Sequence, residues 1–307
     1  MNESGLSVII PFLNEGKEVE LTVENIRETA LCHPDVILIN DGSTDNFDYE
    51  AVAKKYNCRY IRHDERQGVA ASRDEGVVLC ETPYFILLDA HMEFYEQGWD
   101  VRLASVLQVH PRSLVGMRSW VLWESRENRR AKVSPTYGAV ISMNETDIFK
   151  CKWNYTDPDP GSNIVEIACV LGGAYACSRE YWLELDGLHG LMGYGMDEEM
   201  ISLKVRKSGG RCLLIKDMVA GHVYRRQAPY EVVDFVLGNK IFVIELFFEG
   251  GMKERLYEKL RARYGEERFD RVYGERDVVL IERERAYLEG INRRSFSSFI
   301  KDETLKQ

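Results

Sequence analysis

Residues 89–91, Asp-Ala-His, place a carboxylate and an imidazole two positions apart at the end of the apolar run YFILL. Residues two apart in an extended segment point the same way, so Asp89 and His91 could hold the same ligand. A carboxylate oxygen and an imidazole nitrogen suit Mn²⁺ and other transition metals better than Ca²⁺. The pattern favours a metal site, although a strand that simply ends in polar residues explains the same letters.

Two further segments offer groups for a nucleotide. In INDGSTD, Asp41 follows an apolar run and could accept the imino proton of a base or bond a ribose hydroxyl, but ordinary turns have the same composition. In HDERQGVAASRDEG, Arg66 and Arg73 lie around the start of a helix of small residues. Guanidinium groups and helix N-termini favour phosphate oxygens, and a solvated charged helix is the alternative.

The glycine-rich GYGM is followed by Asp197 and Glu198 at the start of a predicted helix. The helix dipole stabilises acids in a first turn, which is a purely structural explanation. The functional one is a carboxylate delivered to a sugar or an acceptor. His222, in AGHVYRR, is isolated in the sequence, and it becomes a candidate ligand only if the fold brings it near His91.

Strands that alternate with helices in the first ninety residues predict an α/β fold with a parallel sheet, whose ligands bind at the carboxyl ends of the strands. We expect the region 112–165 to be irregular and aromatic, and the chain after residue 228 to be mostly helical. The strands are expected at 6–12, 35–40, 58–64, 84–90, 211–217 and 219–225, and the helices within 14–30 and at 179–185 and 197–208.

Composition sets the class of protein. The chain has 307 residues, 45% of them hydrophobic, and a net charge of −10, which argues against a nucleic-acid-binding protein. The seven cysteines form no C-x-x-C pair, so we expect free thiols in a reducing compartment. An apolar strand predicted from Leu6 leaves no room for a signal peptide, and no apolar run approaches membrane-spanning length. We therefore expect a cytoplasmic protein.

Taken in order, the segments SVIIPFLNE, NDGSTD, QGVAASRDEG, DAHME, VLGGAYACS, YGMDEE and GHVYR resemble nucleotide-sugar glycosyltransferases of the GT-A fold. The pattern is shared with family 2. The D-x-H motif in place of D-x-D is most similar to the catalytic domain of polypeptide N-acetylgalactosaminyltransferases. The resemblance covers about residues 6–228. It implies a GT-A catalytic domain over 1–228 and a helical extension over 229–307, packed on that domain or on a partner.

The resemblance also implies roles for individual residues. Asp41 would contact the uracil of a UDP-sugar, and Mn²⁺ or another divalent ion would be coordinated by Asp89, His91 and His222. Tyr194 replaces the family's loop tryptophan. The remaining donor-site residues would be Pro11, Asn14, Glu15, Arg66, Arg73, Gly172, Gly173 and Arg225.

The chain departs from the family where GEN is replaced by MDE, with Asp197 at the acid and Glu198 at an asparagine expected to touch the sugar. The donor sugar, N-acetylgalactosamine or another hexose or N-acetylhexosamine, therefore stays open. The D-x-H branch implies a retaining transfer to a hydroxyl of a glycan, protein or lipid-linked acceptor. The acidic pair also resembles that of inverting family 2 enzymes, in which Glu198 would be the general base.

Other interpretations remain. A nucleotidyltransferase would need a G-x-G-x-R loop where PFLNEG stands. A sugar-nucleotide- or glycan-binding protein without activity would keep the same motifs. The resemblance includes no membrane anchor, stem or lectin module, so a secretory-pathway enzyme is not expected. The apolar segment VVDFVLGNKIFVIELFF would close the core or pair two copies into a homodimer.

Overall fold

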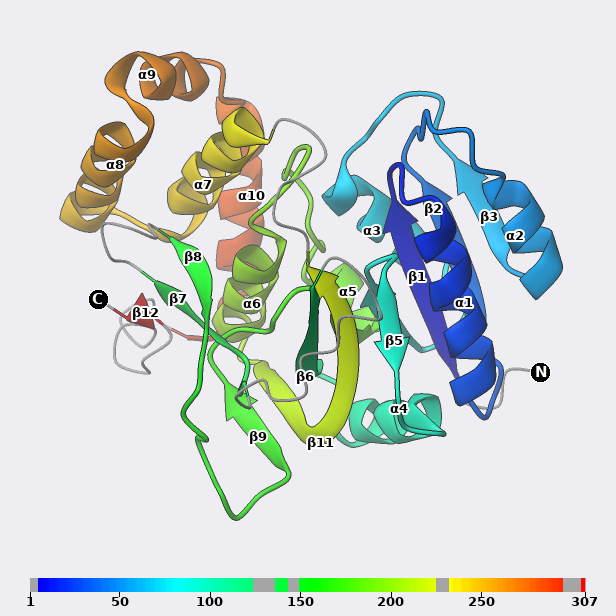
Figure 1. The fold of residues 1–307 in the computed structure, drawn as a ribbon. Helices are drawn as coiled ribbons and strands as arrows, with labels where there is room; N and C mark the ends of the chain where they lie inside the picture. The colour runs from blue at the N-terminus through cyan, green and yellow to red at the C-terminus, as the bar shows by residue number, and fades with distance from the viewer. Residues whose placement is uncertain (1–4, 124–135, 143–148, 225–231, 295–304, 307) are drawn as a thin grey trace.

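The computed structural model describes residues 5–123, 136–142, 149–224, 232–294 and 305–306. A nine-stranded sheet runs through its centre in the order β3-β2-β1-β4-β10-β6-β11-β5, with β9 paired to β11 (Figure 1). Its first strands are parallel and apolar on both faces, as expected when helices cover a sheet on both sides. These strands are β1 (Leu6–Phe12), β2 (Asp35–Asn40), β3 (Arg59–Arg62) and β4 (Tyr84–Leu88).

The second half of the sheet is mixed. Strand β10 is antiparallel to both β4 and β6, whereas β11 is parallel to β6 and antiparallel to β5 and β9. A separate small sheet contains β7, β8 and β12. The bounds are β5 (Met92–Phe94), β6 (Ser113–Trp123), β7 (Ala139–Ser142), β8 (Lys150–Trp153), β9 (Ile164–Ile167), β10 (Ala174–Ser178), β11 (Arg211–Tyr224) and β12 (Leu305–Lys306).

Helices cover both faces of the sheet, and alternate residues of each strand feed two separate cores. Val8 and Ile10 of β1 pack with α1, α2 and α4 on one face. Ile9 packs on the other face, in the core that α3, α5 and α6 share with the C-terminal helices. These helices are α1 (Lys17–Thr29), α2 (Tyr49–Tyr56), α3 (Val69–Leu79), α4 (Trp99–Val109), α5 (Arg179–Glu184) and α6 (Asp197–Lys207).

The prediction that residues 112–165 are irregular is wrong. Strand β6 lies inside the sheet between β10 and β11, and β7, β8 and β9 follow in the same region. The two strands expected at 211–217 and 219–225 are one strand, β11, whose register against β6 shifts between Ile215 and Val219. The shift bends one long strand and does not end it.

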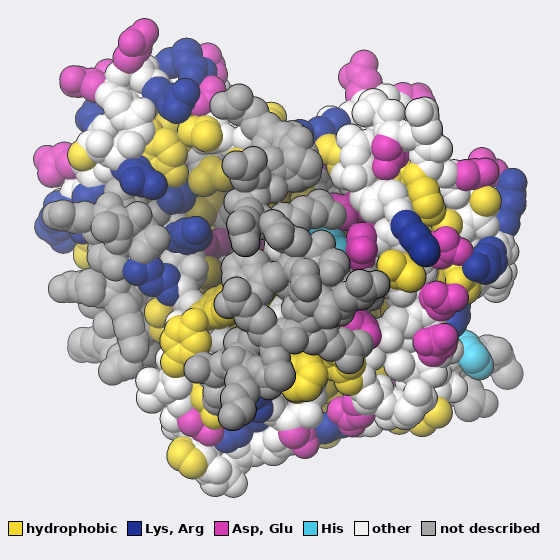
Figure 2. All heavy atoms as spheres, in the orientation of Figure 1, with side chains coloured by type: hydrophobic (Ala, Val, Ile, Leu, Met, Phe, Trp, Pro, Cys, Tyr) yellow, Lys and Arg dark blue, Asp and Glu magenta, His cyan; other side chains and the backbone are white. Residues whose placement is uncertain are grey.

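The C-terminal helices are α7 (Val233–Phe247), α8 (Gly250–Tyr264), α9 (Glu266–Gly274) and α10 (Val278–Gly290). Their apolar residues belong to the same core as α6. On the face shown in Figure 2, lysine and arginine side chains gather over α8. Among the described residues, no helix combines the length and the apolar character that crossing a membrane requires. Pairing of two copies through these helices stays a prediction.

Candidate functional site

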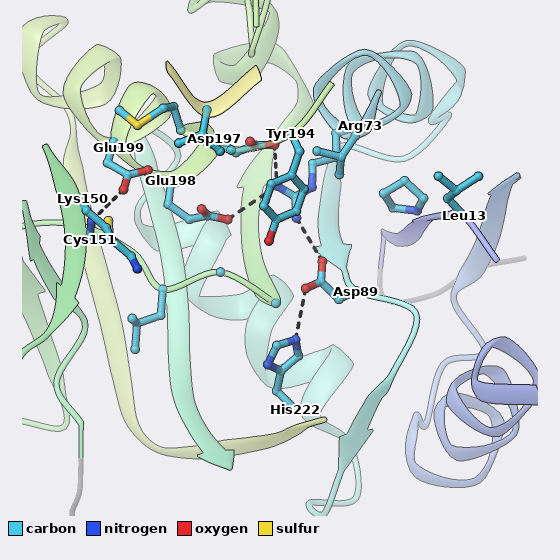
Figure 3. Close-up of a pocket in the computed structure, with 18 of the residues that line it drawn as sticks. Leu13, Arg73, Asp89, Lys150, Cys151, Tyr194, Asp197, Glu198, Glu199 and His222 are labelled. Carbon is cyan, nitrogen blue, oxygen red and sulfur yellow. Dashed lines mark hydrogen bonds and ion pairs between the residues drawn. The ribbon is translucent and has the colours of Figure 1, made fainter. Parts of the chain in front are cut away.

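A pocket of about 650 Å³ opens where β1 and β4 end and where β11 ends beside them. Most of the predicted site residues line it, although they come from distant parts of the chain. They are Pro11, Glu15, Asp41, Arg66, Arg73, Asp89, His91, Gly172, Gly173, Tyr194, Asp197, Glu198 and His222. The close-up in Figure 3 shows Asp89 and His222 at one end of the pocket and Asp197 and Glu198 at the other.

The three predicted metal ligands meet at the lower end of the pocket. The Nε2 atoms of His91 and His222 are 3.1 Å apart, and Nε2 of His222 is 3.2 Å from Oδ2 of Asp89. Strand pairing explains the meeting, because β11 places His222 opposite Met92 of β5, next to His91. One ligand atom from each of the three residues lies within 4.8 Å of the others. Two imidazole nitrogens and a carboxylate oxygen are a donor set that fits Mn²⁺ or another transition metal ion.

Glu15 supports this group from the neighbouring loop. Its Oε2 is 3.1 Å from Nδ1 of His91, the ring nitrogen that faces away from His222. A carboxylate on the second nitrogen fixes the orientation of a metal-binding imidazole and increases its basicity. Glu15 therefore orients His91 in this structure, and its predicted contact with the donor stays a prediction.

Arg73 joins the two ends of the pocket. The side chain of this α3 residue is almost fully buried, and it donates to Oδ1 of Asp89 at 3.1 Å and to Oδ2 of Asp197 at 2.9 Å. It also lies 3.5 Å from Oε1 of Glu198. Figure 3 shows Arg73 between these carboxylates. One cation thus balances three acids, and the predicted contact of Arg73 with a phosphate stays a prediction.

The carboxylates of Asp197 and Glu198 begin α6 at the upper end of the pocket. Burial raises the pKa of Asp197 above its ordinary value, although the charge of Arg73 opposes the shift. Burial likewise raises the pKa of Glu198 to about 8, again against Arg73. Glu198 is therefore able to hold or release a proton near neutral pH.

Gly172 and Gly173 form the floor between the two ends. A Cβ atom on Gly172 would lie 2.8 Å from Oε1 of Glu198, and one on Gly173 would lie 3.2 Å from the ring of His222. Gly173 also has a φ of 98°, in the region that favours glycine. A larger residue at either position would press on Glu198 or His222, so the two glycines let these side chains approach the backbone closely.

Asp41 is held by its own neighbourhood. Its carboxylate accepts hydrogen bonds from the backbone N–H groups of Gln67 and Gly68, and it contacts Nδ1 of His63 at 2.8 Å. The other ring nitrogen of His63 is 2.6 Å from Glu75. Burial works against the charged imidazole, but these two acids outweigh it and raise the pKa of His63. Asp41 lines the pocket, and its contact with a base stays a prediction.

One predicted donor-site residue does not line the pocket, and another falls outside the part of the chain that the structure describes. Asn14, with a φ of 55°, accepts hydrogen bonds from the backbone N–H groups of Thr44 and Asp45, and it is not among the described lining residues. It fixes the turn after β2, a role that explains its left-handed backbone. Arg225 lies outside the described residues.

Sequence reasoning missed several residues at the pocket. Lys240, Arg263 and Tyr264 of the C-terminal helices line it, and His63 contacts the lining residue Asp41 from behind. Asn239 of α7 hydrogen bonds the loop that carries Tyr194. A signal existed for Asn239, because Asn239 and Lys240 interrupt the apolar stretch between Phe235 and Ile244.

Comparisons with known proteins agree with this geometry. The glycosyl transferase family 2 model matches residues 7–163, about half of the chain. The chain is 24% identical over 245 residues to polypeptide N-acetylgalactosaminyltransferase 16 of Mus musculus, which covers 78% of this chain and 43% of the relative. It is 25% identical over 280 residues to N-acetylgalactosaminyltransferase 7 of Drosophila melanogaster, which covers 82% and 46%. The chain thus spans less than half the length of these relatives.

Two solved structures share the fold. GalNAc-T7, crystallised with UDP, GalNAc and Mn²⁺, has a TM-score of 0.77 at 21% identity, over 97% of this chain and 56% of that one. TarS of S. aureus, residues 1–349 with UDP-GlcNAc, has a TM-score of 0.54 at 12% identity, over 96% and 83%. From the family match and this shared fold, the chain belongs to glycosyl transferase family 2 and has the GT-A fold, close to the polypeptide N-acetylgalactosaminyltransferases.

Proposed function

We propose that this protein transfers a sugar from a UDP-sugar to a hydroxyl group of a glycan, a protein or a lipid-linked acceptor. Asp89, His91 and His222 would hold Mn²⁺ or another divalent ion. The observation that carries the proposal is the meeting of their ligand atoms beside the glycine floor, in a pocket of about 650 Å³. The structure of GalNAc-T7 with UDP, GalNAc and Mn²⁺ supports it.

The chemistry follows from where the groups lie. A metal ion at this site would neutralise the charge that develops on the leaving diphosphate. Arg73 keeps Asp89 ionised and in place, and Glu15 orients His91. Asp41 and Arg66 also line the pocket, and they would contact the nucleoside. The sugar would lie above Gly172 and Gly173, between the proposed metal ligands and Glu198.

The finer assignments rest on relatives. The D-x-H motif and the similarity to N-acetylgalactosaminyltransferases favour a retaining transfer from UDP-GalNAc or another UDP-hexose or UDP-N-acetylhexosamine. The acidic Glu198 in place of the family asparagine leaves the choice of sugar to experiment.

Calorimetric titration of UDP, with Mn²⁺ and then with EDTA, tests the proposal. We expect binding that requires the metal and that is lost in both Asp89→Ala and His222→Ala. His110→Ala, a histidine change outside the pocket lining, is the matched control and should bind as the wild type does. Binding that ignores Mn²⁺ would refute the metal assignment, and absence of UDP binding would refute the nucleotide. UDP binding without turnover of any UDP-sugar would indicate a binding protein.

A second candidate is an inverting transfer with Glu198 as general base. The observation that favours it is the pKa of Glu198, which burial raises to about 8, so that its carboxylate is a stronger base than an ordinary glutamate. Its Oε1 borders the glycine floor, where it could reach an acceptor hydroxyl.

The anomeric configuration of the product, read by NMR, separates the two mechanisms. An inverted product, with turnover reduced about 10²- to 10⁴-fold in Glu198→Gln, would establish the base mechanism. A retained product would exclude it. In either mechanism Glu198→Gln should still bind UDP, because Glu198 is not one of the three residues proposed to hold the metal ion.

A further inference from the structure

The C-terminal helix α7 packs on the glycine-rich segment that leads into α6, which we call the acid loop (Leu188–Met196). Asn239 of α7 is 2% exposed, and its side chain makes four hydrogen bonds to the backbone of this loop. Oδ1 accepts from the N–H of Met192 at 2.9 Å. Nδ2 donates to the carbonyl oxygens of Met192, Tyr194 and Gly195 at 2.8, 3.2 and 2.9 Å.

The loop glycines fit against apolar side chains of the same helix. A Cβ atom on Gly190 would lie 2.2 Å from the ring of Phe242, and one on Gly193 would lie 2.5 Å from the ring of Phe235. Both glycines have positive φ, of 93° and 59°. The backbone of the acid loop thus lies directly on α7, in a conformation that other residues adopt only with strain.

The opposite side of the loop is tied to α3. The N–H of Val69 donates to the carbonyl oxygen of Gly193 at 3.0 Å, next to the hydrogen bonds that fasten Gly68 to Asp41. The loop is therefore held between the start of α3 and α7. It carries Tyr194, which lies over the pocket, and it leads directly into Asp197 (Figure 3).

We propose that Asn239 is a positioning residue that sets the acid loop, so that α7 forms part of the donor and acceptor site. This inference rests on the proposed transferase function. An amide is required at this position, because the loop presents one N–H and three carbonyl oxygens to it. An aspartate of the same shape would keep the bond to Met192 but would face the three carbonyl oxygens with a charged acceptor.

The test compares Asn239→Asp with Asp277→Ala, which removes the N-cap of α10 in the same C-terminal part without touching the acid loop. We expect Asn239→Asp to lose about 10- to 100-fold in kcat with a UDP-sugar, since a small misplacement of catalytic groups has effects of this size. UDP affinity should stay near the wild-type value, because Asp89, His91 and His222, the residues proposed to hold the metal ion, do not contact Asn239. Asp277→Ala should leave both quantities unchanged.

A purely structural role would lower kcat and UDP affinity together, and a wild-type kcat in Asn239→Asp would overturn the proposal outright. If Asn239→Asp does not fold, Phe235→Ala is the second variant. It removes the partly exposed ring on which Gly193 of the acid loop packs, and it should lower kcat severalfold. Hydrogen exchange gives a readout without turnover. The backbone amides of residues 192–197 should exchange faster in Asn239→Asp than in Asp277→Ala, even if no UDP-sugar is a substrate. Equal exchange in the two variants would refute the proposal that Asn239 positions the acid loop.

Discussion

Asp89 and Glu198 line one pocket and both lie beside the cation Arg73, yet their pKa values are shifted in opposite directions. Burial alone would raise the pKa of Asp89, but the hydrogen bond to His222 and the charge of Arg73 hold it well below its ordinary value. The pKa of Glu198 is raised to about 8. Exposure does not explain the difference, since the two side chains are 27% and 20% exposed.

The groups that surround each carboxylate explain why the two pKa values are shifted in opposite directions. Asp89 has a direct hydrogen bond from Arg73 and two imidazoles beside it, whereas Glu198 has Arg73 only at 3.5 Å and lies next to the acids Asp197 and Glu199. The comparison shows that one arginine can lie beside two carboxylates of which the first, also bonded to His222, stays ionised and the second can carry a proton near neutral pH.

Replacing Arg73, which contacts both carboxylates, should have the largest effect on stability and on binding. In Arg73→Met, Asp89 and Asp197 lose their buried partner, so we expect the free energy of unfolding to fall by about 3–5 kcal/mol. The metal-dependent binding of UDP should fall with it. Urea unfolding measures the first and calorimetry the second.

Arg73→Lys is the control, because it keeps the charge but cannot reach both ends with one planar group. It should lose less stability than Arg73→Met. Wild-type stability in Arg73→Met would show that the acids are balanced by other groups.

Glu15→Gln should change the surroundings of Asp89, His91 and His222 and leave those of Glu198 as they are. Without the carboxylate on Nδ1 of His91, metal affinity should fall about 10- to 100-fold, which is typical for outer partners of metal-binding histidines. Titration of Mn²⁺ in the presence of UDP measures this. The fold should be unaffected, and Glu18→Gln, in the first turn of the helix α1 that follows, is the matched control. Equal Mn²⁺ affinity in Glu15→Gln and the wild type would contradict the assigned role.

The smallest effect is expected at His63, whose two ring nitrogens contact the carboxylates of Asp41 and Glu75. Because the folded pKa of His63 is raised, its stabilisation is complete below the unfolded value near 6.5 and is lost as the pH rises through the folded pKa. His63→Asn should therefore cost about 1 kcal/mol at pH 6, the size of a net hydrogen bond, and less at pH 9. Urea unfolding at both pH values checks this, and a difference that grows with pH would contradict it.

Much of the first half of the fold could be predicted from local pattern. The strands β1, β2 and β4 are short apolar runs bounded by polar residues, and the structure places them within two residues of their predicted ends. Strand β6 was missed because it contains Arg118 and Ser119 and has no clean alternation. It lies inside the sheet through pairing with β10 and β11, which are far away in the sequence.

The site divides in the same way. Asp89 and His91 stand out locally, and in the structure a ligand atom of each lies within 4.8 Å of the other. His222 is separated from His91 by 131 residues, so only the resemblance to a family, and not spacing, assigned it. Asn239 and Glu15 act through contacts between distant backbones and side chains, which no local pattern contains.

The long strand β11 has a consequence for the order of assembly. It brings His222 to Asp89 and His91 only after it has paired with β6 and β5, so the complete ligand set arises late, once most of the sheet has closed. Contacts this remote in the sequence close slowly during folding. A cation that binds only the finished set would stabilise the native state by mass action. Cation binding would then report on whether a newly made chain has completed its sheet.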